Sequence, residues 1–181
     1  MARLDPQALV EHLDRLYRAA WGLCGSREEA EDLVQETAAR VLARPRQLHG
    51  QDELAYLMRA LRNTFLLTRR TASRRPQVRA TLDDIDPPEA RTSVRPEAAV
   101  ETRELFAAIS ALPEDFRLAL VAVDVAGLSY REAADVLETK EATITSRISR
   151  ARDRVAQALA LGEPVSIALP REGPGPNRSL G

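Results

Sequence analysis

A row of arginine and hydroxyl side chains near the end of the sequence could recognise a nucleic acid. At roughly 100° per residue, the helix predicted after the turn at 138–141 gathers them on one face: Thr143, Ser146, Arg147, Arg150 and Arg154. Arginine can bind a guanine edge with two hydrogen bonds or contact a phosphate, and serine and threonine can do either more weakly. The pattern favours a DNA-binding face, and the alternative is a solvated charged face on an ordinary bundle helix.

The opposite face of this helix is apolar and is predicted to be buried through Ile144, Ile148, Ala151, Val155 and Leu159. Ser129 and Glu132 have the spacing of a capping box, which predicts a short helix over 130–137. Before it, an apolar helix over 116–126 is expected to end at Gly127. A short helix, a turn and a longer basic helix form the architecture that places a recognition helix in the major groove of DNA.

A second cationic segment lies between Leu54 and Leu82, where the sequence contains no aspartate or glutamate. Besides Arg75 and Arg79, it contains the candidate binding residues Arg59, Arg62, Asn63, Arg69, Arg70 and Arg74, and all of these six but Arg69 cluster on one side of the predicted helix. The like charges of such a basic surface repel one another, which indicates a polyanion partner whose phosphates would neutralise them. Because one linker joins the two basic surfaces, binding of one surface to DNA would raise the effective concentration of the other near the same DNA.

Acidic side chains gather on the helix that a capping box formed by Ser26 and Glu29 is expected to open. The outer face of this helix carries Glu28, Asp32, Gln35 and Glu36. Carboxylates in a first turn favour the helix dipole, but Asp32, Gln35 and Glu36 lie beyond that turn. A role in binding a basic protein surface and a purely structural role are equally compatible with this pattern.

The composition argues against several classes of site. The single cysteine, Cys24, cannot form an intramolecular disulfide and is expected to be a buried, inert thiol. His12 and His49 lie far apart and lack a cysteine partner, so no metal site is expected. No catalytic residue or cofactor is expected either, since the sequence offers no nucleophile–base pair and no phosphate-binding glycine loop. Without a signal-peptide core or a long apolar run, the cytoplasm is the expected compartment.

Apolar residues recur with the helical period over 9–72 and again over 97–161. Apolar and polar residues do not alternate over any sustained stretch, as they would in a strand, so the sequence predicts an all-α fold. Two small helical domains are expected: a first unit over 1–75 and a second unit over 98–161. Residues 76–97 are rich in proline and acidic residues and are expected to form a flexible linker. The tail over 162–181 has the composition of a disordered segment.

Five short motifs follow one another along the chain. They are Asp32-Leu-Val-Gln-Glu-Thr37, Arg62-Asn63, Ala111-Leu-Pro-Glu-Asp-Phe116, Gly127-Leu-Ser-Tyr-Arg-Glu-Ala133 and Ser146-Arg-Ile-Ser-Arg-Ala-Arg152. In these motifs and their order, the sequence over 5–160 resembles the extracytoplasmic-function (ECF) sigma factors of bacterial RNA polymerase. Each motif is weak alone, whereas five in the family's order are specific.

The resemblance implies a role for each surface. The first unit would be sigma region 2, and it would bind the clamp helices of the largest polymerase subunit through Asp32, Leu33, Gln35 and Glu36. Its arginine-rich helix would engage the −10 promoter element, with Asn63 near a flipped-out base. The second unit would be sigma region 4, with its last helix reading the −35 element. The implied partners are core RNA polymerase, promoter DNA and an anti-sigma factor.

Some positions depart from the family pattern. Thr145 stands where a basic residue is common, Leu67 stands where many members carry aspartate, and the loop over 46–51 has no aromatic side chain to stack on a flipped base. An autonomous helix-turn-helix regulator, which would usually dimerise on a two-fold operator, is the first alternative. It would leave the acidic helix unexplained. The second alternative is a helical adaptor that binds no nucleic acid.

Overall fold

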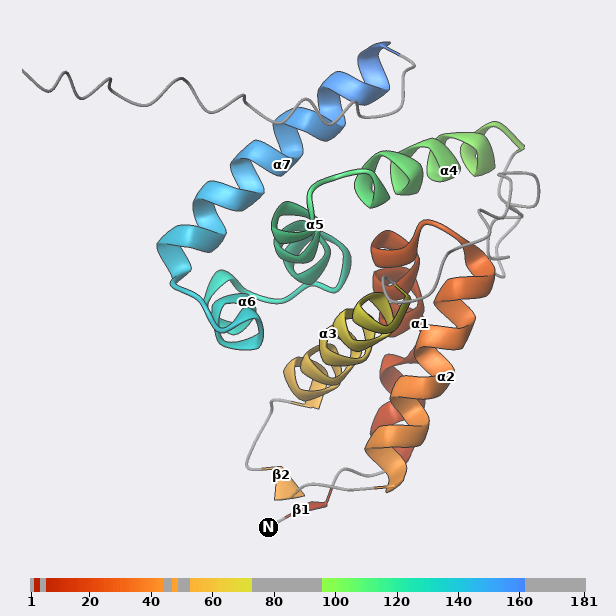
Figure 1. Cartoon of the computed structure of the whole chain (residues 1–181), viewed down its shortest axis with the longest axis vertical. Coiled ribbons are helices and arrows are strands. Elements are labelled where there is room, and N and C mark those ends of the chain that lie inside the picture. Colours follow the sequence, from red (N-terminus) through yellow and green to blue (C-terminus); the bar gives the residue numbers. More distant parts are fainter. Residues whose placement is uncertain (1, 4–5, 44–46, 49–52, 73–95, 162–181) are drawn as a thin grey trace, which may run out of the picture.

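The computed structural model describes residues 2–3, 6–43, 47–48, 53–72 and 96–161 (Figure 1). Its helices confirm the all-α class, and they are α1 (Pro6–Cys24), α2 (Arg27–Ala43), α3 (Glu53–Ala72), α4 (Pro96–Ser110), α5 (Glu114–Leu120), the π-helical turn η1 (Val121–Val125), α6 (Tyr130–Leu137) and α7 (Glu141–Leu161). The predicted tail and the predicted linker as far as residue 95 lie outside the described residues.

The first unit is a three-helix bundle in which α1 packs against both α2 and α3. The side chains at its centre are almost fully buried, and they include Leu16, Trp21, Leu23, Leu57 and Leu61. Ser26 caps α2 as expected, since its hydroxyl accepts a hydrogen bond from the Glu29 N–H at 3.2 Å. Strands β1 (Ala2–Arg3) and β2 (Gln47–Leu48) pair antiparallel. No strand was predicted here, because two residues are too few to show an alternating apolar and polar pattern.

The centre of the second unit differs from the single apolar helix expected over 116–126. There α5 ends at Leu120, and η1 continues with a hydrogen bond of 2.9 Å from the Ala126 N–H to the Val121 carbonyl, five residues back. Gly127, with a φ of 80°, ends the turn as predicted.

The apolar face of α7 is buried as predicted at Ile144, Ile148, Ala151 and Val155. The prediction for Leu159 was wrong: this side chain is 43% exposed, and Ala158 is buried in its place. Steps of four, three, four and three residues from Ile144 arrive at Ala158, and Leu159 lies about 100° further round the helix.

A complete capping box closes the N-terminus of α6, as the sequence predicts. The Ser129 hydroxyl accepts a hydrogen bond from the Glu132 N–H at 3.2 Å, and the Glu132 carboxylate accepts one from the Ser129 N–H at 2.7 Å. Hydrogen bonds from the side chain and backbone of Ser129 lower the pKa of Glu132. The stabilisation from this carboxylate is therefore present at neutral pH and is lost as the pH falls through the lowered pKa.

Replacing Ser129 with alanine should lower the free energy of unfolding at pH 7 by about 1 kcal/mol, because the Glu132 N–H loses its acceptor and the Glu132 carboxylate loses the Ser129 hydroxyl. Urea unfolding followed by circular dichroism measures the change. Ser149→Ala, at an exposed position within α7, is the control and should change the value by less than about 0.5 kcal/mol. Equal values for the two variants would show that the cap does not stabilise α6.

The two units share one hydrophobic core. Trp21 of α1 stacks on Phe106 of α4, with ring centroids 4.5 Å apart and planes within 5°. Gly22 permits η1 to approach α1, since a Cβ atom at this position would lie 2.9 Å from Cγ2 of Val121. Helix α3 also packs against α6, and α5 lies between the first three helices and α7 (Figure 1). The two units are thus packed directly against each other rather than joined only through the linker.

Candidate nucleic-acid interface

The predicted recognition face of α7 divides into exposed and engaged side chains. Ser146 and Arg150 are exposed. Arg147 forms an ion pair of 2.6 Å with Asp115 of α5, which leaves its side chain 25% exposed. The guanidinium of Arg154 lies 4.9 Å from the ring centroid of Phe116, a cation–π contact. Ser146 and Arg150 are therefore the most accessible groups on this face, and Thr143 lies beside them, half-buried.

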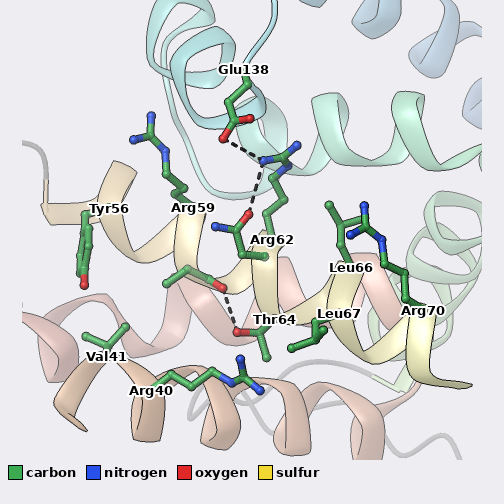
Figure 2. Close-up of a pocket in the computed structure, with 12 residues that line it drawn as sticks. Arg40, Val41, Tyr56, Arg59, Arg62, Thr64, Leu66, Leu67, Arg70 and Glu138 are labelled. Atoms are coloured by element: carbon green, nitrogen blue, oxygen red, sulfur yellow. Dashed lines mark hydrogen bonds and ion pairs between the residues drawn. The ribbon is translucent and has the colours of Figure 1, made fainter. Parts of the chain in front are cut away.

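Helix α3 borders a groove of about 670 Å³, called the α3 groove here (Figure 2). Four of the predicted −10 residues line it, and they are Arg59, Arg62, Asn63 and Arg70. Leu66, which interrupts the basic face in the sequence, also lines the groove. Arg74 lies outside the described residues. The structure thus brings together most of the basic face predicted from the helical period.

Two arginines of the α3 groove contact the second unit. The Nη2 group of Arg59 donates a hydrogen bond of 2.7 Å to the Asp135 carbonyl in the last turn of α6. The Nη1 group of Arg62 lies 3.5 Å from the Glu138 carboxylate and donates to the Asn63 side-chain oxygen at 3.4 Å (Figure 2). The predicted nucleic-acid surface of α3 therefore faces the end of α6.

Arg69, also predicted to be a −10 residue, lies on a different side of α3. It lines a second groove of about 940 Å³, called the α2 groove here, and it pairs with Glu114 at 3.6 Å. Arg117 of α5 lies in the same groove and donates a hydrogen bond of 2.6 Å to the Leu23 carbonyl. Burial is the main cause that lowers the pKa of Arg117, and Arg69 adds to the shift. Arg69 is thus separated from the α3 groove.

The acidic face of α2 forms the other wall of the α2 groove. Asp32, Gln35 and Glu36 are exposed there, as predicted, whereas Leu33 is only 6% exposed and belongs to the core. Burial raises the pKa of Glu29, and Glu28 adds to this shift. Carboxylates therefore line one wall of the α2 groove, and the guanidinium groups of Arg69 and Arg117 lie on the opposite wall.

Arg40 and Tyr56 are among the residues of the α3 groove that were not predicted from the sequence. Tyr56 lies seven residues before Asn63, which is two turns along one face of α3, so the helical period could have found it. Arg40 comes from α2, where its Nε group lies 2.6 Å from the Glu36 carboxylate. Its place in the groove depends on how α2 packs against α3, which the spacing within one helix does not reveal.

Two family models match the chain. The model described as Sigma-70 region 2 matches residues 9–75, and the one described as Sigma-70, region 4 matches residues 102–155. The ECF RNA polymerase sigma factor EcfG of Rhodopseudomonas palustris is 38% identical over 144 residues, which are 77% of this chain and 76% of that protein. The chain belongs to the ECF sigma factor family. The matched segments place α1–α3 of this sigma factor in region 2 and most of α4–α7 in region 4.

Other relatives agree with this assignment. The ECF sigma factor SigE of Mycolicibacterium smegmatis is 36% identical over 154 residues, which are 83% of this chain and 59% of that protein. A solved structure of the sigma factor RpoE in complex with the anti-sigma factor NepR, from Bartonella quintana, is 29% identical with a TM-score of 0.71. The match covers 86% of this sigma factor and 96% of that chain.

Cys24 of this sigma factor is half-buried and lines the α2 groove at the end of α1. Burial is the main cause that raises the pKa of its thiol to about 12. Because the thiolate is the nucleophile, iodoacetamide at pH 8 should alkylate the folded chain roughly a thousandfold more slowly than the urea-unfolded chain, where the pKa is about 8.5. Mass spectrometry of quenched samples measures both rates, and comparable rates would contradict this prediction.

The candidate functional surfaces of this sigma factor are built from arginine, carboxylate and hydroxyl side chains on α2, α3 and α7. Within the described ranges, no group of three His, Cys, Asp or Glu side chains is placed to hold a metal ion. None of the helices described is long and apolar enough to cross a membrane.

Proposed function

We propose that this ECF sigma factor binds core RNA polymerase through the acidic face of α2 and directs it to promoters. The observation that supports this proposal is the exposure of Asp32, Gln35 and Glu36 on a helix whose opposite face is in the core. Carboxylates beyond the first helical turn are stabilised little by the helix dipole. Binding to a basic partner surface therefore explains their position better. Leu33, being buried, would act by holding α2 in place rather than by direct contact.

In this proposal, α7 is the recognition helix of region 4 and reads the −35 element. Ser146 and Arg150 are exposed and can reach base edges, with Thr143 beside them. Arg147 and Arg154 also belong to this face. Because they are engaged by Asp115 and Phe116, contacts to phosphate oxygens suit them better than base readout does.

Region 2 would engage the −10 element through the α3 groove. Arg59, Arg62 and Arg70 would contact phosphates there, and Asn63 would lie near an unpaired base. Arg69 would take less part in this contact, because it faces the α2 groove. Arg74 is assigned to the same surface from the sequence alone.

The further assignments follow from this role. The first unit over 1–75 would perform core binding and −10 recognition, the second unit over 98–161 would perform −35 recognition, and 76–97 would link them. The sigma factor would work without catalysis of its own and in the cytoplasm, where its polymerase acts. Because the related RpoE is found in complex with the anti-sigma factor NepR, an anti-sigma factor is proposed as a further partner.

Replacing Asp32 with arginine tests the core-binding face. The charge reversal should weaken binding to core polymerase at least about tenfold, since like charges facing each other at an interface cost several kcal/mol, and the fold should be unaffected because Asp32 is exposed. Affinity for core polymerase, measured by fluorescence anisotropy of the labelled full chain, gives the result. Glu104→Arg, an equal charge reversal at an exposed site on α4, is the control. A folded Asp32→Arg variant with unchanged affinity would contradict the assignment.

A further inference from the structure

A two-point ion pair joins the recognition helix α7 to the π-helical turn η1. The guanidinium of Arg152 donates two hydrogen bonds to the Asp124 carboxylate, from Nε at 2.8 Å and from Nη2 at 2.7 Å. Two parallel hydrogen bonds of this kind require the planar guanidinium and the planar carboxylate to be aligned, so they fix an orientation as well as a distance. The pair therefore restrains how α7 sits on η1.

The π-helical turn brings Asp124 toward α7. Phe116 of α5 faces α7, since its ring contacts Arg154. In an uninterrupted α-helix, at roughly 100° per residue, Asp124 would lie about 80° round the axis from Phe116. A π-helical turn holds more residues than an α-helical turn, so η1 turns Asp124 back toward the side of Phe116. The extra residue in η1 thus explains how the Asp124 carboxylate reaches Arg152.

Contacts hold α7 at both edges of its buried face. Arg152 and Arg154 are two positions apart, so they lie about 160° apart around the helix, on either side of the buried Ala151. Arg154 is held by Phe116 at one edge, and Arg152 is held by Asp124 at the other. A helix held at one edge can roll about its axis, whereas contacts at both edges oppose rotation in either direction.

From this geometry we propose that the pair of Asp124 and Arg152 positions the recognition helix, by fixing its rotation so that Ser146 and Arg150 face DNA. A helix with its side chains is about 10–12 Å across, so a rotation of about 20° would move a group on its surface by roughly 2 Å. A displacement of this size breaks a hydrogen bond to a base edge.

Arg152 is a positioning residue in this account. It follows Arg150 by two positions and so lies about 160° away from it around the helix, where its guanidinium is engaged by Asp124. It therefore acts on DNA recognition through the orientation of Arg150. The inference rests on the proposed function, because it takes α7 to read the −35 element.

The test uses the full-length chain in complex with core polymerase and a promoter that this complex transcribes. The ratio measured is transcription from this promoter divided by transcription from the same promoter with one base pair of the −35 element changed. A single mismatched base pair typically costs roughly five- to 150-fold, and Arg152→Lys should reduce the ratio at least about threefold. Lysine keeps the positive charge but cannot form the two parallel hydrogen bonds.

Asp124→Asn should have the same effect, and the double variant should be no worse than either single variant, because each change breaks the same pair. Ser129→Ala is the control, since it weakens the cap of α6 and leaves the contacts at both edges of α7 in place. It should leave the ratio unchanged. If Arg152→Lys likewise lowers transcription from both promoters equally, its role is only structural and the inference is overturned.

A variant with both Ser146→Ala and Arg150→Ala separates this inference from the function on which it rests. If that variant leaves the ratio unchanged at every position of the −35 element, the reading role of α7 fails and the inference fails with it. If that variant lowers the ratio and Arg152→Lys does not, only the positioning role of the pair fails.

Discussion

Replacing Trp21 with alanine should destabilise the folded chain by about 3–5 kcal/mol. The side chain is 1% exposed, and its ring stacks on Phe106 across the boundary between the two units. Removal of the ring would open a cavity at this boundary and also lose the aromatic pair. Urea unfolding followed by circular dichroism measures the loss. Trp21→Phe keeps an aromatic ring and should cost much less than Trp21→Ala.

The same variant tests whether the two units form one cooperative body. Because Trp21 packs against the second unit, Trp21→Ala should shift the unfolding of helices in both units. Hydrogen exchange measured by mass spectrometry can follow peptides of α3 and α7 separately. A loss of protection restricted to the first unit, or a cost below about 1 kcal/mol, would contradict the shared core.

Replacing Arg150 with alanine should weaken recognition of a −35 element by about 1–3 kcal/mol, or roughly five- to 150-fold, if its guanidinium forms a bidentate contact with a base. Arg150 is exposed on α7, whereas Arg147 is tied to Asp115. Substitution of Arg150 is therefore better suited than substitution of Arg147 to change DNA binding without changing the fold.

Transcription by the polymerase complex from a promoter and from variants changed singly across the −35 element measures this effect. The expected result is a loss on the original promoter together with reduced discrimination at one base position. Arg15→Ala removes an equal charge from an exposed site on α1 and should leave transcription unchanged. A uniform loss over all promoters would indicate a phosphate contact, and no loss would remove Arg150 from the recognition face.

Features set by short-range spacing were predicted well from the sequence. The capping box of Ser129 and Glu132, the helix end at Gly127 and the buried face of α7 depend on residues a few positions apart. The division of the apolar helix at Leu120 was not predicted, because a π-helical turn changes one hydrogen bond and hardly disturbs the apolar pattern.

The site was predicted in part, for a related reason. The helical period gathered Arg59, Arg62, Asn63 and Arg70 correctly, but the partners of these residues come from far along the chain. The Arg59 contact with Asp135 spans 76 positions and the Arg147 pair with Asp115 spans 32. Arg69 shows the same limit, because it was grouped by composition with neighbours that face another groove.

We expect this chain to give core RNA polymerase its promoter specificity. The most direct test is transcription of sheared genomic DNA from the host by core polymerase, with and without the chain, followed by sequencing of RNA 5′ ends. We expect new start sites that appear only with the chain and share sequence elements near −35 and −10, and these sites should be lost with Asp32→Arg. An unchanged set of start sites, together with tight sequence-specific binding of duplex DNA by the chain alone, would contradict the claim and favour an autonomous regulator.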